Sequence, residues 1–310
     1  MPTLHWEGQS IAVAPGESAL DALLGAGVSI PHSCRAGACQ SCLLQATAGE
    51  IPPSSQQGLK PALIAQGYLL SCLCRPETDL DLAAPGPGAR VPAVITKLNW
   101  LSESVLQVHL TATEPLDHRP GQYLTLLRED GLARSYSIAG QALELHVRRI
   151  PGGAMSNWLA DAAPGTQVTL QGPAGDCFYT PGNPHQPILL AGAGTGLAPL
   201  YGILRDALRH GHQGPIWLYH GALNERGLYL TAELEALAAA HPNVHYQPTL
   251  FHRDGPLPED LAAAHPRLSG WRGFVCGDPH IVNLLRKRLF LAGMASRAIS
   301  ADAFLPTTLK

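Results

Sequence analysis

Four cysteines with unequal spacing constrain this 310-residue chain more than any other feature. Cys34, Cys39 and Cys42 are separated by four and then two residues, and 29 residues follow before Cys72. Small residues fill the first part, Ser-Cys-Arg-Ala-Gly-Ala-Cys-Gln-Ser-Cys, so the backbone can wrap closely with its amides directed at sulfur. Thiols that merely fill a core would be scattered, whereas five of the seven cysteines here fall within 41 residues. The spacing therefore predicts a shared ligand.

This spacing, with a distant fourth cysteine, is the plant-type [2Fe–2S] signature. Zinc is the main alternative, but structural zinc sites favour two short paired spacings. Residues 1 to about 85 resemble a plant-type ferredoxin domain, a β-grasp fold, and the distance to Cys72 resembles the distance in that family. We expect the segment 69–74 to be a strand, which turns Cys72 and Cys74 to the same side. We choose Cys72 as the ligand and interpret Cys74 as a small apolar residue.

Composition excludes several classes of protein. Apolar residues at 45% and charged residues at 15% indicate a globular chain rather than a disordered one. A net charge of −3 argues against nucleic-acid binding, which needs a clustered basic surface. We find no export signal and no apolar run of membrane-spanning length, so we expect a cytoplasmic protein without membrane insertion. Residues 1–90 hold four basic and seven acidic residues, so this module could meet a basic patch on a partner, although an ordinary solvated surface is the explanation we favour.

Two segments rich in proline and glycine, 83–92 and 180–187, divide the chain. We expect domains at 1–88, 92–182 and 185–310. The middle segment contains short runs that alternate in polarity, which predicts an antiparallel barrel or sandwich. The third alternates strands with helices, which predicts a parallel doubly wound sheet. The strands are expected at 94–98, 105–110, 123–127, 143–147, 167–170, 188–191, 216–219 and 273–276, and the helices at 199–210, 231–240 and 281–291.

Two motifs of the middle segment suggest a cofactor with phosphates. The strand-like run Arg134-Ser135-Tyr136-Ser137 offers a phosphate clamp, a stacking plate and hydroxyl groups. About 15 residues later, Gly152-Gly153 precedes a helical pattern that contains Ser156, and the free amides of a helix start form an anion site. Taken alone, this second motif favours an ordinary capped helix, but the ordered pair of motifs is far more specific than either one.

A glycine loop opens the third segment. Residues 188–199 have the order strand, glycine loop, helix, but the glycines follow G-x-G-x-G-x-x-P rather than the dinucleotide fingerprint G-x-G-x-x-G. The loop still permits close approach of a phosphate to the helix start. Pro199 lies early in the helix, where its missing amide costs little.

Taken in order, these motifs resemble the ferredoxin–NAD(P)+ reductase family. Its R-x-Y-S, G-G-x-x-S, G-x-G-T-G-x-A-P and C-G-x-P patterns have counterparts at residues 134–137, 152–156, 192–199 and 276–279. The resemblance implies that Arg134 binds the FAD pyrophosphate, Tyr136 stacks on the isoalloxazine and Ser137 bonds near its reactive nitrogen. It places Cys276 beside the nicotinamide, and we count Tyr136, Ser137 and Cys276 as the catalytic candidates. Further cofactor contacts implied are Tyr123, Ser135, Gly153, Met155, Ser156, Gly192, Gly194, Thr195, Gly196, Gly277, Asp278 and Phe304. Each of three residues keeps an alternative interpretation. Tyr123 is alternatively an aromatic residue of the barrel core, and Cys276 a buried thiol at the end of a strand. Phe304 alternatively makes no contact with the flavin.

The order of modules is similar to the single-chain reductase components of bacterial oxygenases. That resemblance implies transfer from NADH to FAD, then to the [2Fe–2S] cluster and on to a terminal oxygenase or another one-electron acceptor. We favour NADH over NADPH because Arg226 is the sole fixed positive charge after the strand 216–219, and Glu225 adjoins it. Alternatives left open are a deoxysugar dehydrase, a haem-thiolate monooxygenase or a desaturase as acceptor, a redox-sensing module, and a structural metal-binding protein. Of the 14 histidines, only His146 lies beside the flavin motifs.

Overall fold

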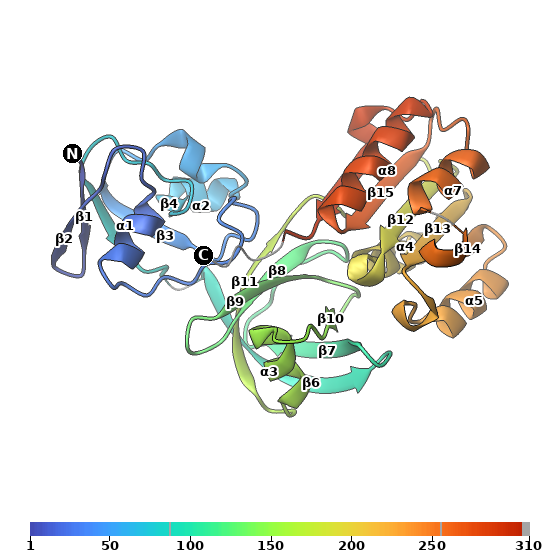
Figure 1. Ribbon diagram of the computed structural model, residues 1–310, viewed down its shortest axis with the longest axis horizontal. Coiled ribbons are helices and arrows are strands. Elements are labelled where there is room, and N and C mark those ends of the chain that lie inside the picture. The colour runs from blue at the N-terminus through green and yellow to red at the C-terminus, as the bar shows by residue number, and fades with distance from the viewer. Residues whose placement is uncertain (87, 255, 306–310) are drawn as a thin grey trace.

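The computed structural model describes residues 1–86, 88–254 and 256–305. Within them lie three separate sheets, one in each part of the chain. Figure 1 shows the N-terminal domain in blue, the green barrel domain in the middle, and the yellow-to-red C-terminal domain on the far side of the barrel. The expected multi-domain architecture, with α+β and α/β parts, is confirmed.

The N-terminal domain is a mixed sheet with a helix packed on it, as a β-grasp fold requires. Its strand order is β2-β1-β5-β3-β4, with β1 and β5 parallel and the other pairs antiparallel. Helix α1 begins after Ser18, whose hydroxyl accepts a hydrogen bond from the amide of Asp21 as an N-cap. The elements are β1 (Thr3–Trp6), β2 (Gln9–Ala12), α1 (Ala19–Gly25), β3 (Leu43–Gly49), α2 (Pro61–Ala65), β4 (Tyr68–Leu70) and β5 (Leu80–Ala83).

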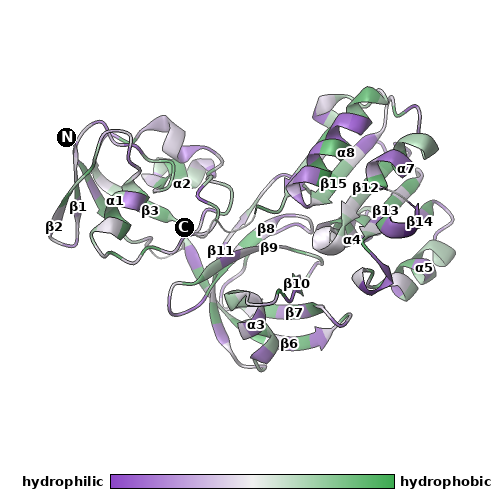
Figure 2. Ribbon diagram, viewed as in Figure 1, coloured by the Kyte–Doolittle hydropathy of each residue, from purple (hydrophilic) through white to green (hydrophobic). Residues whose placement is uncertain are grey.

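The barrel domain consists of six antiparallel strands in the order β10-β7-β6-β11-β8-β9. An isolated bridge between Ile138 and Leu145 brings the β9 edge back to β10 and closes the barrel. Figure 2 shows the alternation of hydropathy along β6 and β7, which sends every second side chain into the core. The elements are β6 (Arg90–Trp100), β7 (Val105–Ala112), β8 (Tyr123–Leu127), β9 (Ala133–Ser137), β10 (Leu143–Arg148), α3 (Ala154–Asp161) and β11 (Gln167–Ala174).

The connection between these two domains is shorter than the sequence predicts. Strand β5 ends at Ala83 and β6 already begins at Arg90. Val91 and Pro92 pair with β11 rather than belonging to the linker. Proline fits this strand because its carbonyl still accepts a hydrogen bond, here from the amide of Thr113.

The C-terminal domain is a parallel five-stranded sheet in the order β14-β13-β12-β15-β16. From β12 the chain continues to β13 and β14 on one side of the sheet, and then crosses to β15 and β16 on the other side. The direction of winding thus reverses between β12 and β15, and parallel sheets bind ligands at such a topological switch point. Strands β14 and β16 were not predicted from the sequence. The elements are β12 (Ile188–Ala193), α4 (Leu197–Arg209), β13 (Ile216–Ala222), α5 (Thr231–Ala240), β14 (Val244–Leu250), α6 (Phe251–Asp254), α7 (Leu257–Ala264), β15 (Arg272–Gly277), α8 (Pro279–Leu291) and β16 (Ile299–Ala303).

Within the described residues, no helix is both long enough and apolar enough to cross a bilayer.

Candidate functional site

The four predicted cluster cysteines are brought together and buried as two pairs. The amides of Ala36 and Cys39 donate to Cys34 Sγ over 3.3 Å each, and the Ser41 hydroxyl lies 3.0 Å from Cys39 Sγ. The contacts of Cys39 with the Cys34 thiol and with Ser41 lower its pKa to about 5 despite burial. Cys42 is likewise hydrogen-bonded to Cys72. Within each pair one thiol thus has a lowered pKa, Cys39 or Cys72, while the bond to that thiol and burial raise the pKa of its partner, Cys34 or Cys42.

This pairing fits a two-iron cluster better than a single ion. No three metal-ligating side chains converge on one point within residues 1–86, 88–254 and 256–305. A structural zinc site needs four ligands around one metal. In a [2Fe–2S] cluster the four cysteines are shared between two irons, so ligands arranged as two pairs are what it requires.

The strand expected at residues 69–74 is wrong in its second half. Strand β4 ends at Leu70, and a turn follows in which the amides of Leu73 and Cys74 both bond to the Leu70 carbonyl. The turn separates the two cysteines, so Cys72 faces Cys42 whereas Cys74 lies by the Ser55 hydroxyl. Burial raises the pKa of the Cys74 thiol to about 11, which suits a neutral core residue.

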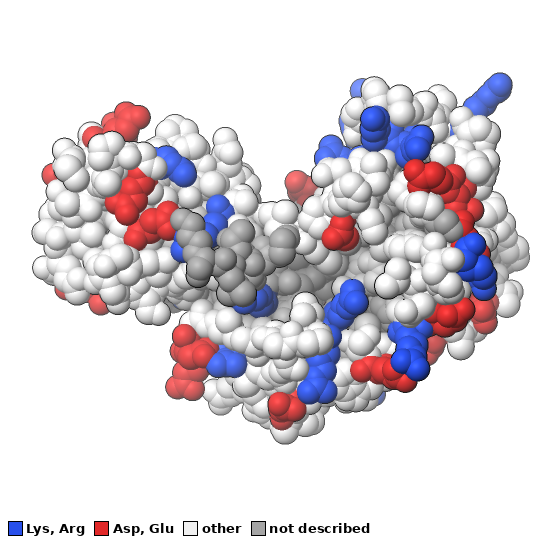
Figure 3. Space-filling model, in the orientation of Figure 1, with Lys and Arg blue, Asp and Glu red and all other residues white. Residues whose placement is uncertain are grey.

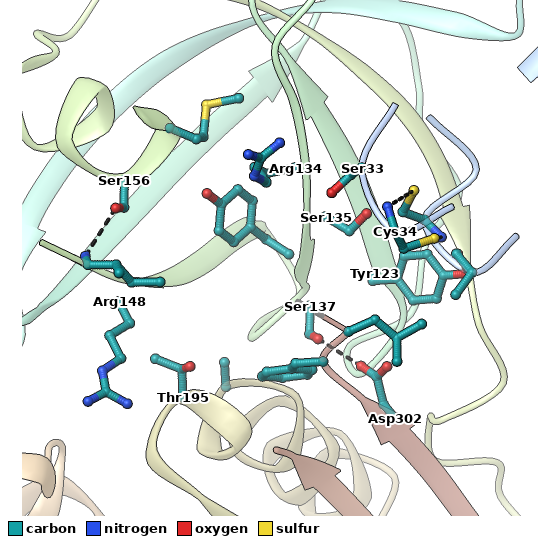
Figure 4. A pocket seen from close by; sticks show the side chains of 18 of the residues that line it. Ser33, Cys34, Tyr123, Arg134, Ser135, Ser137, Arg148, Ser156, Thr195 and Asp302 are labelled. Carbon is teal, nitrogen blue, oxygen red and sulfur yellow. Dashed lines mark hydrogen bonds between the residues drawn. The ribbon is translucent and has the colours of Figure 1, made fainter. Parts of the chain in front are cut away.

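A cavity of about 570 Å³ lies where the three domains meet. It is lined by the cluster loop, by the ends of β8, β9 and β10, by the start of α3, and by the start of α4 and the end of β16 (Figure 4). Most predicted cofactor contacts line this cavity. They are Tyr123, Arg134, Ser135, Tyr136, Ser137, Gly153, Met155, Ser156, Thr195, Asp278 and Phe304.

The flavin motif forms strand β9, which places its four side chains along one wall. The Ser137 hydroxyl donates to Asp302 Oδ2 over 2.9 Å, so it links the barrel to β16 (Figure 4). Burial raises the pKa of the Asp302 carboxyl and of the Tyr136 phenol. Tyr136 lies in the cavity wall as a half-buried plate, in a position to stack on a planar ring.

The second phosphate motif forms the start of α3, with Gly153 as the N-cap. The Ser156 hydroxyl accepts a hydrogen bond from the amide of Ile150 over 3.1 Å and so closes the turn before the helix. Met155 is buried, and it contacts the cavity at the first turn of the helix. Free amides at this end face the cavity, where an anion is favoured.

The glycine loop after β12 packs tightly on β15. A Cβ on Gly192 or Gly196 would lie 2.7 or 2.3 Å from the Cys276 carbonyl oxygen, so both positions require glycine for packing alone. Gly194 has φ of +54° and Gly277 of +122°. The Cys276 side chain is fully buried and its Sγ lies 3.5 Å from that of Cys177, so the structure places this thiol behind the cavity lining.

Three cavity residues carry chemistry that the motifs did not assign. Arg148 is the last residue of β10, and its side chain is exposed. It lies near Gly194, where its charge would meet a bound phosphate. His146 lies two residues earlier on the same strand. Its Nε2 is 2.9 Å from Glu144 Oε1, and its Nδ1 is 3.1 Å from the Tyr229 hydroxyl. Asp302 precedes Phe304, whose amide donates to the Gly277 carbonyl over 2.8 Å. Alternation along β10 was the available signal, because it turns His146 and Arg148 to one side.

Comparison with known proteins finds a different family model in each of the three parts of the chain. Three family models match, a 2Fe-2S iron-sulfur cluster binding domain at residues 3–77, an oxidoreductase FAD-binding domain at 93–179 and an oxidoreductase NAD-binding domain at 190–287. The reductase subunit of an aromatic O-demethylase from an Amycolatopsis species is 33% identical over 97% of this chain and 98% of its own. The ferredoxin–NAD(P)+ reductase component of naphthalene 1,2-dioxygenase/salicylate 5-hydroxylase systems from a Ralstonia species is 30% identical over 94% of both chains.

The chain belongs to this family of oxygenase reductase components. Among solved structures, the Amycolatopsis cytochrome P450 reductase covers 99% of this reductase at 31% identity, with a TM-score of 0.70. The ferredoxin reductase of carbazole 1,9a-dioxygenase, at 24% identity and a TM-score of 0.66, shows the same fold. The reductase is therefore an oxidoreductase with a [2Fe–2S] domain, an FAD-binding domain and an NAD-binding domain.

Proposed function

We propose that this reductase takes electrons from NADH and passes them through FAD and the [2Fe–2S] cluster to the terminal oxygenase of a bacterial oxygenase system. When bound, FAD would accept the two electrons of a hydride together and release them one at a time to the cluster. We also propose 1–88, 92–182 and 185–310 as the limits of the three domains, and the cytoplasm as the place of action.

One observation carries the proposal: a single cavity is lined from all three domains. Cys34 and Cys39 of the cluster loop, Tyr136 of the flavin strand and Thr195 of the glycine loop all contact it. Cofactors bound by these three groups would meet within one cavity, which suits transfer between them. Figure 3 shows the molecule hollowed between the barrel domain and the nucleotide domain, with basic side chains at the rim of the hollow.

The surroundings of β13 support NADH as the electron donor. A 2′-phosphate would need positive charge at the end of this strand, but His220 is fully buried and burial lowers its pKa to about 3. Arg253 is occupied by Asp254, with nitrogen–oxygen distances of 2.7 and 3.0 Å. Arg226 thus remains next to Glu225, which would repel a phosphate.

The acceptor is proposed from the relatives, whose names assign them to aromatic demethylase and dioxygenase systems. In Figure 3 acidic side chains dominate the visible face of the ferredoxin domain. A basic patch on the oxygenase would complement this face and speed association at low salt.

An anaerobic visible-absorption titration of the purified holoprotein tests the proposal. NADH is expected to bleach first the flavin band and then the cluster bands, while NADPH at equal concentration acts much more slowly. Bleaching of the flavin with an oxidised cluster would contradict the proposed order. No response to either nucleotide would refute the reductase function.

A further inference from the structure

Two polar side chains on the outer face of the barrel are buried although they point away from the barrel core. Thr125 on β8 is 1% exposed and Gln171 on β11 is 4% exposed. Their neighbours Leu124, Leu126 and Leu170 belong to the barrel core, so alternation turns Thr125 and Gln171 outward. The ferredoxin domain covers this outward face, and the burial marks a contact between domains.

The contact includes three hydrogen bonds from the barrel to three successive carbonyls of the cluster loop. Tyr123 Oη donates to one carbonyl over 2.5 Å, Thr125 Oγ1 to the next over 2.6 Å, and Gln171 Nε2 to the third. We call Tyr123, Thr125 and Gln171 the docking triad. The carbonyls belong, in this order, to Ala38, Cys39 and Gln40.

Strand pairing explains why the donors match the loop. Gln171 is directly opposite Thr125 in the β8–β11 register, and Thr125 is directly opposite Ser135 in the β8–β9 register. Arg90 lies opposite Gln171 on β6, and its Nε donates to Gln171 Oε1 over 3.1 Å. This bond fixes the orientation of the amide, so that its NH₂ group faces the loop.

Thr125 also links the cluster loop to the flavin wall. Its oxygen lies 2.9 Å from that of Ser135, which lines the cavity. A hydroxyl has one proton, and that of Thr125 is directed at the Cys39 carbonyl. Ser135 must therefore donate to Thr125, and it turns only oxygen lone pairs toward the cavity. The chain Ser135, Thr125, Cys39 is a continuous hydrogen-bonded path from the flavin wall to a predicted iron ligand.

We propose that the docking triad is a positioning device for internal electron transfer, which holds the Cys34/Cys39 edge of the cluster loop against the flavin cavity. The proposal rests on the electron path described under the proposed function. Thr125 and Gln171 act through the loop and do not line the flavin cavity. Loss of the Thr125 donor leaves the buried Cys39 carbonyl without this partner, and loss of Gln171 leaves the Gln40 carbonyl with the Leu43 amide alone, so either loss lowers the docked population of the loop.

The decisive variant is Thr125→Val, which keeps the shape of the side chain and removes its hydroxyl. In anaerobic stopped-flow mixing of the holoenzyme with NADH, we expect the rate of flavin bleaching to change less than the rate of the cluster bleaching that follows, because Thr125 reaches the flavin cavity only through Ser135. We expect the following cluster bleaching to slow by about fivefold or more, because loss of the hydrogen bond to a buried carbonyl lowers the docked population from which the cluster is reduced. Hydrogen–deuterium exchange gives a readout that needs no turnover: amides of residues 36–40 should exchange about 5 to 150 times faster.

Two controls separate the hydroxyl from packing. Thr125→Ser retains the donor and should restore both the transfer rate and amide protection. Thr113→Val makes the same change elsewhere on the barrel, where Thr113 Oγ1 donates to the Pro92 carbonyl over 3.0 Å, and should leave both readouts unchanged. If Thr125→Val lacks flavin or cluster absorption, Gln171→Met must give the same pair of effects.

Wild-type transfer and wild-type amide exchange in Thr125→Val would overturn the proposal. So would a Thr125→Ser variant as impaired as Thr125→Val, because packing would then be responsible. If NADH does not reduce the wild-type flavin, the proposed function fails, whereas amide exchange still tests the docking triad by itself.

Discussion

The barrel is joined to its two neighbours by different chemistry. On the ferredoxin side, hydroxyl and amide donors meet backbone carbonyls, and the contact contains no ion pair among the bonds of the docking triad. On the nucleotide side, each bond includes at least one ionisable side chain. Gln141 donates to Asp206 over 3.0 Å, His146 contacts Tyr229, and Ser137 donates to Asp302.

This difference matches what each contact must do. Electrons cross from the barrel to the cluster loop without movement of atoms, so a rigid, neutral contact suits that side. Nicotinamide nucleotides must enter and leave the other side, where the bonds depend on carboxyl and imidazole groups whose charge a bound nucleotide would influence. The comparison predicts that one side depends on geometry and the other on charge.

The largest effect is expected from removal of a ligand on the ferredoxin side. Cys72→Ser should abolish the visible bands of the cluster, because serine does not replace a thiolate among the four sulfur ligands. Flavin absorption and flavin reduction by NADH should persist, since they depend on the other side of the barrel. Absorption spectra and iron content of the purified variant measure this.

Cys74→Ser is the matched control and should keep a full complement of iron. The turn at residues 71–73 directs the Cys74 side chain toward Ser55. Loss of iron in Cys74→Ser with retention in Cys72→Ser would reverse the ligand assignment.

A smaller effect is expected from Asp302 on the nucleotide side. Asp302→Ala frees the Ser137 hydroxyl, which then no longer presents its lone pairs to the cavity in one orientation. We expect reduction of the flavin by NADH to slow by about tenfold to hundredfold, measured by stopped-flow bleaching. Transfer from flavin to cluster should change little.

Asp302→Asn keeps an oxygen that accepts from Ser137 and should therefore be less impaired than Asp302→Ala. A variant Asp302→Ala that keeps its flavin and reacts with NADH at the wild-type rate would show that this bond does not position Ser137.

Local sequence patterns predicted some elements and motifs correctly and missed others. Two local motifs can be recognised from the sequence, because strands and helix starts fix the direction of their side chains over a few residues. They are Arg134-Ser135-Tyr136-Ser137 and the glycine loop. Helix α5 was predicted with its observed limits, 231–240. Strand β14 was missed because its sequence Val-His-Tyr-Gln-Pro-Thr-Leu is polar and contains a proline, which an edge strand tolerates.

The docking triad could not be predicted from such patterns. Thr125 and Gln171 are ordinary outward residues of barrel strands, and their partners are backbone carbonyls 86 and 131 positions away. Backbone carbonyls carry no sequence signal, so contacts of this kind depend on how domains pack. The same holds for Ser137 and Asp302, which are 165 positions apart.

The smallest effect separates the two sides by pH, through Glu144, whose Oε2 lies 3.9 Å from Arg205 Nη1 on α4 of the nucleotide domain. Burial alone raises the pKa of Glu144, but hydrogen bonds from His146 and Gln107 outweigh it and lower the pKa to about 2, from 4.5 in the unfolded chain. A carboxyl whose pKa is depressed by folding stabilises the protein fully above its unfolded pKa, and this stabilisation is lost as the pH falls toward the folded value. The free energy of unfolding should thus lose about 1–2 kcal/mol from this group between pH 5 and pH 3, after allowance for screening.

Urea unfolding of the wild type, Glu144→Gln and Thr125→Val at these two pH values checks this. The difference between wild type and Glu144→Gln should shrink by that amount as the pH falls, because glutamine does not titrate. The difference between wild type and Thr125→Val should stay constant, because the docking triad has no group that titrates in this range. Equal pH dependence of the two differences would mean that the charged and the neutral contacts of the barrel are not energetically distinct.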